Sequence, residues 1–290
     1  MRIYQAIHSA TNPSAPDSQT WLRNLYSPLI DLGHEVTLFP TDEGRIAMKK
    51  GDKKLKSKFS ERLLGNFLHN HQRKPYDMFF SYLMDGMVYP EVIQEISKRG
   101  VPTLNFSCNN VHQFDLVDGI SPYFDFNLHA EKAVKEKFKA VGANPIWWPM
   151  AANPKFFKPF QVPKTIDVAF VGANYALRQN YIAYLLTNGI DVHAYGPNWQ
   201  ISGVLKETLK RLRLGIKTLF ASPRRIQSRL SSKLAFDDFH RWIVSQFPEN
   251  FHGPLTDQDM IMLYSKSEIS LGFLEVFEDH NQNKPLKKHL

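Results

Sequence analysis

The segment from Gly172 to Arg178 combines a glycine, polar side chains and a cation directly after an apolar run. The run 166–171 is typical of a buried strand, and Arg178 falls in the first turn of the helix expected next. A helix N-terminus offers N–H groups to anions, and a guanidinium pairs with phosphate oxygens. The segment is therefore a candidate phosphate-binding loop. The alternative interpretations are a tight turn at Gly172 and a solvated helix face at Arg178.

A second group of polar residues follows the expected strand 102–107. His112 and Asp115 are three residues apart there, a spacing that would let them orient a substrate hydroxyl or accept its proton. Ordinary loop polarity, or a helix cap supplied by Asn109 or Asn110, explains the same residues. His8 and the neighbouring Ser9, at the end of the first expected strand, are lesser candidates.

Two repeats of one plan are expected to position these loops. Segment 2–7 predicts a strand, 21–32 a helix ended by Gly33, and 35–40 a second strand; segments 166–171, 177–186 and 191–195 repeat the order, with Gly189 ending the helix. Parallel strand–helix–strand units of this kind build Rossmann-like sheets. The sequence therefore predicts an α/β fold with two Rossmann-like domains, residues 1–155 and 164–290, joined by a proline-rich linker at about 152–164.

Length and composition agree with that plan. The chain has 290 residues, 43% of them hydrophobic, which at about 150 residues per domain predicts two domains with adequate cores. The single cysteine, Cys108, excludes a disulfide within the chain and a zinc site built from cysteines. No stretch approaches the roughly 18 apolar residues of a membrane span, and the N-terminus lacks a signal-peptide layout. These features favour a cytoplasmic protein. Neither half carries the glycine fingerprint of dinucleotide-binding enzymes, which disfavours dehydrogenases.

The net charge of +8 is concentrated in two segments. Seven basic residues against one acidic lie between Arg45 and Lys58, and nine against one between Lys206 and Lys233. An apolar stripe at 205–219 runs beside lysines and arginines, a pattern typical of a helix on an anionic membrane surface, although such a stripe can also pack against its own domain. Nucleic-acid binding is not favoured, because the chain has no recognisable reader motif. The alternative for both segments is a solvated surface.

Two longer stretches of sequence resemble a known family. The stretches DVAFVGANYALRQNYIAYLLTNGIDVHAYGPNW and NFHGPLTDQDMIMLYSKSEISLGF together cover most of residues 165–273. They resemble the CgeB-like, or spore-maturation-protein-like, branch of the GT-B glycosyltransferases. The N-terminal half resembles that family only in its layout and in the stretch NFSCNNVHQFD.

The resemblance implies an enzyme that transfers a sugar from a nucleotide-sugar co-substrate to an acceptor across a cleft, with no other cofactor and no tightly bound metal. It implies a donor site made of Gly172, Asn174, Arg178, Tyr195, Gly196, His252 and Gly253. In the family a segment with an acidic residue and a glycine follows the Ile-Ser-Leu strand and contacts the donor, and this chain ends where that segment begins. The second domain is therefore expected to be incomplete. The alternative is a non-catalytic GT-B-like binding module or an inactive fragment.

Overall fold

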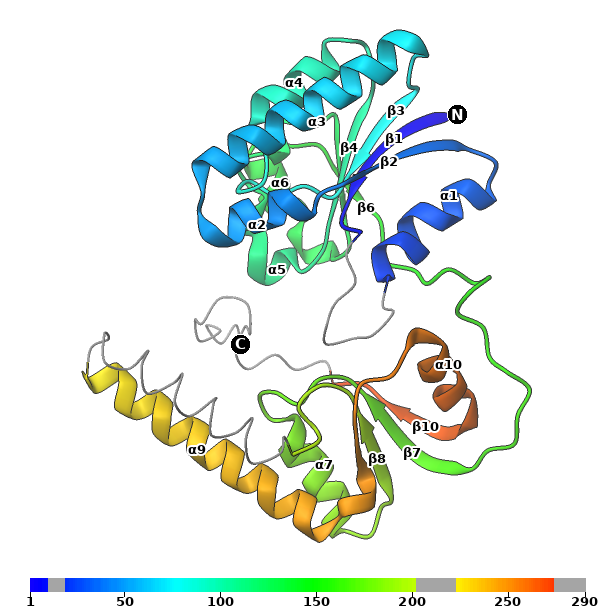
Figure 1. Ribbon diagram of the computed structural model, residues 1–290, viewed down its shortest axis with the longest axis vertical. Coiled ribbons are helices and arrows are strands. Elements are labelled where there is room, and N and C mark those ends of the chain that lie inside the picture. Colours follow the sequence, from blue (N-terminus) through cyan, green and yellow to red (C-terminus); the bar gives the residue numbers. More distant parts are fainter. Residues whose placement is uncertain (10–18, 202–222, 274–290) are drawn as a thin grey trace. The chain divides into compact units, whose positions relative to one another are not determined.

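The structure is a computed structural model that describes residues 1–9, 19–201 and 223–273. A six-stranded parallel sheet lies at the centre of the first half of the chain (Figure 1). The strand order is β2-β1-β3-β4-β5-β6. Because β2 and β3 pair with opposite sides of β1, the chain reverses its direction across the sheet between β1 and β3. The strands are β1 (Arg2–Ile7), β2 (Glu35–Pro40), β3 (Met78–Ser81), β4 (Thr103–Ser107), β5 (Phe126–His129) and β6 (Pro145–Trp147).

Helices cover both faces of this sheet. Adjacent side chains of a strand point to opposite faces, so the apolar residues of β1 contribute to a core on each side. Tyr4 packs into a cluster with α3 and α4, which lie side by side in Figure 1, and Ile3 packs with Leu25 on the other face. The helices are α1 (Ser27–Asp31), α2 (Asp42–Lys50), α3 (Lys53–Arg73), α4 (Pro90–Ser97), α5 (Asn110–Gln113) and α6 (Lys135–Ala140). The short turns are η1 (Leu22–Tyr26), η2 (Phe114–Leu116), η3 (Ser121–Tyr123) and η4 (Lys132–Val134).

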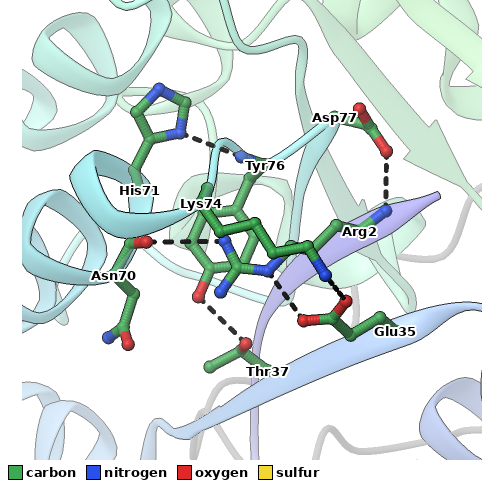
Figure 2. Close-up of polar contacts among 8 residues, drawn as sticks. All are labelled: Arg2, Glu35, Thr37, Asn70, His71, Lys74, Tyr76 and Asp77. Carbon is green, nitrogen blue, oxygen red and sulfur yellow. Dashed lines mark hydrogen bonds and ion pairs between the residues drawn. The ribbon is translucent and has the colours of Figure 1, made fainter.

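A cluster centred on Arg2 joins β1 and β2, at their amino ends, to the end of α3 and the segment that leads into β3 (Figure 2). The Arg2 guanidinium donates to Glu35 Oε1 at 2.9 Å and lies 4.0 Å from the centre of the Tyr76 ring. It also bonds the backbone oxygen of Lys74, whose ammonium pairs with the same carboxylate. Tyr76 donates in turn to Thr37 Oγ1 at 2.9 Å. These bonds fix the end of α3 against β1 and β2.

A four-stranded parallel sheet forms the second half, in the order β10-β7-β8-β9. Its core contains Val168, Ile182, Trp199, Ile243 and Phe251, drawn from two strands, two helices and a loop. The strands are β7 (Ile166–Val171), β8 (Val192–Tyr195), β9 (Phe251–His252) and β10 (Ser267–Leu271). The helices are α7 (Arg178–Thr187), α9 (Pro223–Gln246) and α10 (Asp257–Lys266), with a short turn η5 (Pro248–Asn250).

The described residues divide into two compact units, one ending at Phe157 and the other beginning at Lys158. The predicted α/β class with parallel sheets is confirmed. The helix expected at 21–32 instead begins with a π-helical turn before α1. The basic apolar stripe at 205–219 lies outside the described residues.

Candidate functional site

The predicted donor residues lie at the carboxyl ends of β7, β8 and β9 in the second unit. Since β8 and β10 pair with opposite sides of β7, the loop after β7 starts where the chain reverses across the sheet. Ligands of open parallel sheets bind outside the carboxyl ends of the strands at such a reversal. The loop 172–177 is therefore at the position where the topology favours a ligand.

Two glycines allow the loops after β7 and β8 to approach closely. Gly196 has φ 139°, and a Cβ atom there would lie 2.4 Å from the backbone oxygen of Gly172. The N–H of Gly172 donates to the Tyr195 oxygen at 2.9 Å, and the N–H of Gly196 donates to the Gly253 oxygen at 3.1 Å. Residue 196 must be glycine because both its backbone conformation and the available space exclude a side chain.

Arg178 begins α7, and its guanidinium turns back toward the loop. It donates to the Ala173 oxygen at 3.0 Å and to the Tyr175 hydroxyl at 2.8 Å, and it lies 4.0 Å from the centre of the Tyr175 ring. These bonds use two of its five N–H groups. The backbone N–H groups of Arg178 and Asn180 donate to the oxygens of Tyr175 and Leu177. The guanidinium is therefore a better anion donor than the helix N-terminus itself.

Asn174 anchors the loop from behind. Its side chain is 3% exposed, and its amide nitrogen lies 3.2 Å from His240 Nδ1 in α9 and 3.4 Å from Gln179 Oε1. Its backbone N–H donates to the Pro197 oxygen at 2.9 Å. Asn174 Oδ1 has no hydrogen-bond partner within the described part of the chain. The side chain connects the loop to two helices, and this contact holds the loop in place.

An aromatic stack occupies the ends of β8 and β9. The rings of Tyr195 and His252 are 4.1 Å apart and nearly parallel, and His252 Nε2 lies 3.0 Å from His193 Nδ1. Burial, followed by the His193 imidazole, lowers the pKa of His252. A Cβ atom on Gly253 would come within 3.0 Å of Gln200 Oε1. The His252 ring therefore lies between two other rings, next to the loop junction.

In the first unit, His112 lies in α5 and Asp115 lies in η2, just after β4. Both side chains are exposed. Asn109 precedes α5 with a positive φ of 61° but makes no side-chain cap bond, whereas Asn110 Oδ1 accepts from Ser107 at 3.0 Å. The expected polar loop is present, on two short helical turns.

A second group of polar side chains in the first unit lies after β1, where the chain reverses its direction across the sheet. His8, after β1, pairs through Nδ1 with Asp42 at the start of α2, and the Ser9 hydroxyl donates to the same carboxylate at 2.9 Å. Burial and the charges of Arg45 and Lys49 lower the pKa of His8, outweighing the opposite effect of Asp42. Sequence reasoning ranked His8 and Ser9 low and missed Asp42. Because β1 and β2 pair in parallel with Ile7 opposite Pro40, the residues that follow the two strands lie side by side, and Asp42 comes beside His8.

Asp42 also borders a cavity along β2, an edge strand of the sheet. The cavity has a volume of about 620 Å³. Its walls are the strand and residues of α2 and α3: Thr37, Leu38, Phe39, Pro40, Asp42, Glu43, Arg62, Asn66 and Asn70. An ion pair between Arg62 and Glu43, 2.8 Å long, spans α3 and α2. A groove with both polar and apolar walls therefore runs along the strand and reaches Asp42.

Comparison with known proteins does not assign a function to the chain. The sequence matches no family model, and no curated protein is significantly similar to it. Over the described ranges, no three metal-ligating side chains come together. None of the helices in those ranges combines the length and apolarity needed to cross a bilayer.

Proposed function

We propose that the chain is a glycosyltransferase of the CgeB-like GT-B type, which moves a sugar from a nucleotide-sugar to an acceptor without a bound metal. The observation that carries this proposal is the Arg178 guanidinium beside the loop after β7, where the second sheet reverses. A departing nucleoside diphosphate gains negative charge. A guanidinium with remaining N–H groups stabilises that charge without a metal.

Gly172 supports the same assignment. Its missing side chain lets the Arg178 guanidinium lie against the loop, because a Cβ atom there would come within 3.0 Å of Arg178 Nη1. Arg178 is already held by Ala173 and Tyr175, so its position costs little additional ordering when a ligand binds. Under this proposal the Tyr195 and His252 rings lie toward the nucleoside.

His8 is the general base that we assign to the acceptor reaction, in place of His112. Its lowered pKa keeps the imidazole neutral near pH 7, and Asp42 fixes the orientation of Nδ1, leaving Nε2 to accept a proton. In the step proposed, the acceptor oxygen bonds the anomeric carbon and its proton passes to His8. The bond to the diphosphate breaks, and its electron pair leaves with the phosphate oxygen.

Binding of nucleoside diphosphates tests the donor assignment. Calorimetry with UDP, GDP, ADP and TDP should identify one that binds, and Arg178→Ala should weaken it by about 1–3 kcal/mol. Arg241→Ala is the matched control, because Arg241 lies in the same unit and pairs with Asp238 on the surface of α9. Equal affinities of the two variants for the diphosphate would contradict the donor assignment.

Turnover tests the catalytic part separately. With a panel of nucleotide-sugars, His8→Ala should lower kcat by about 10²–10⁴-fold and leave diphosphate binding unchanged. His69→Ala, an exposed histidine of α3, is the control. Binding without hydrolysis or transfer by the unmodified chain would instead identify a non-catalytic binding module.

A further inference from the structure

The connection between α2 and α3 forms a compact hairpin, which we call the basic hairpin and define as residues 45–58. Gly51 reverses the chain with φ 63°, and the Asp52 carboxylate accepts from the N–H groups of Lys54 and Leu55 at 3.0 Å. A Cβ atom on Gly44 would come within 2.9 Å of the Phe59 ring, so the two helices pack closely. The hairpin is therefore a rigid support for the side chains that it exposes.

Five exposed lysines gather on this hairpin, and we call them the hairpin lysines: Lys49, Lys50, Lys53, Lys54 and Lys58. In the ranges that the structure covers, none of them has a carboxylate within ion-pair distance. The nearby acids are used elsewhere. Asp52 caps α3, Glu43 pairs with Arg62, and Asp85 accepts from the N–H groups of residues 119 and 120. Among the residues that the structure describes, no acidic side chain therefore neutralises the lysine charges.

The position of these lysines in α3 opposes the helix dipole. Cations are unfavourable at a helix N-terminus, and the first turn of α3 contains Lys53 and Lys54 but no acidic residue. Like charges that face one another across the hairpin repel as well. Helix stability therefore does not explain Lys53 and Lys54, whereas Lys49 and Lys50 stand in the last turn of α2, where the dipole favours cations. An external anion would offset the unfavourable placement of Lys53 and Lys54.

The neighbouring side chains favour a membrane surface over a nucleic acid. Ile46 is 47% exposed and lies one turn before Lys50 on α2, which places an apolar side chain beside the charges. The hairpin itself contains no aromatic residue on which a base could stack. Clusters of four to eight basic residues on a surface helix are typical of anionic lipid binding.

We propose that the basic hairpin docks on an anionic phospholipid membrane, with the hairpin lysines at the headgroup phosphates and Ile46 at the edge of the acyl region. Contact of this kind needs no change in the fold of the unit. It depends on salt, because the lysines are exposed and their attraction is screened. The proposal is independent of the sugar-transfer reaction.

Sedimentation with vesicles tests this proposal. The full chain should bind phosphatidylcholine vesicles that contain phosphatidylglycerol, and should not bind phosphatidylcholine alone. The double variant Lys53→Gln/Lys54→Gln should bind about 30-fold more weakly. Its Tm should be equal to that of the unmodified chain or higher, because the removed charges oppose the helix dipole, so a folding defect does not confuse the result.

The matched control is Lys98→Gln/Lys139→Gln, which removes the same charge from lysines of the first unit that pair with Glu95 and Glu136. Under the proposal this control keeps full vesicle binding. Equal loss in both double variants, or no binding by the unmodified chain, would overturn the proposal. So would tighter binding of duplex DNA with the same dependence on Lys53 and Lys54, which would identify a nucleic-acid surface.

Discussion

Replacing Gly196 with alanine tests the loop junction of the second unit. The new Cβ atom would lie 2.4 Å from the oxygen and 2.8 Å from the carbon of the Gly172 carbonyl. Ordinary contact begins at 3.4 Å, so one loop must move by about 1 Å. Alanine at φ 139° costs about 1–3 kcal/mol, and overpacking costs about 1–3 kcal/mol more. We therefore expect the free energy of unfolding to fall by about 2–6 kcal/mol.

Gly189→Ala separates the steric clash from the backbone strain. Gly189 also has a positive φ, 79°, but no atom lies within 4 Å of a Cβ placed there. This control should therefore cost only about 1–2 kcal/mol. Urea unfolding followed by tryptophan fluorescence measures both variants, and Trp199 is a suitable reporter because it is fully buried and its indole N–H donates to the Gly172 oxygen at 2.7 Å.

Hydrogen exchange of segment 192–199 locates the effect. Protection should fall there in Gly196→Ala and remain near normal in Gly189→Ala, and diphosphate binding should weaken only in the first variant. If the two variants unfold at the same urea concentration and exchange alike, the loops do not approach as described. Residue 196 would then not need to be glycine.

Three further predictions concern the first unit. Arg2→Met should lower the free energy of unfolding by about 2 kcal/mol in urea denaturation, because the charged hydrogen bonds and the contact with the Tyr76 ring are lost. The surface variant Arg99→Met should lower it by less than about 0.5 kcal/mol. Equal losses in the two variants would refute the role of Arg2. The bonds from Lys74 and Arg2 lower the pKa of Glu35, so its stabilisation should disappear as the pH falls through that lowered pKa, and Glu35→Gln should flatten the stability–pH curve in this acidic range. Arg45→Gln should raise the pKa of His8 in an NMR titration, since it removes a charge that opposes protonation, and an unchanged pKa would show that the Arg45 charge does not influence the imidazole.

Much of the fold could be predicted from local pattern. The strands at 2–7, 35–40 and 166–171 begin and end where hydrophobic periodicity predicts, because they are short, apolar and bounded by polar or glycine-containing segments. The α2 helix was not predicted as a helix, since its sequence was interpreted only as a basic segment. It forms because Asp42 and Glu43 begin it favourably and Gly51 ends it.

The candidate site depends on strand order, which local pattern does not determine. The sequence predicted that Gly172 and Arg178 follow a strand, but the neighbouring β10 arrives from a segment about 100 residues later in the chain. The contact of His8 with Asp42 also depends on which strands pair. The stack of Tyr195 on His252 could be expected only once β8 and β9 were known to be neighbours.

The α2 helix connects two features described separately above. It begins at Asp42, the partner of His8, and ends at Lys49 and Lys50 on the basic hairpin, and the field of Lys49 reaches the imidazole. Any anionic layer that neutralises this lysine also removes a charge that disfavours protonation. Docking of the hairpin should therefore shift the pKa of His8 upward, in the direction opposite to the effect of Lys49.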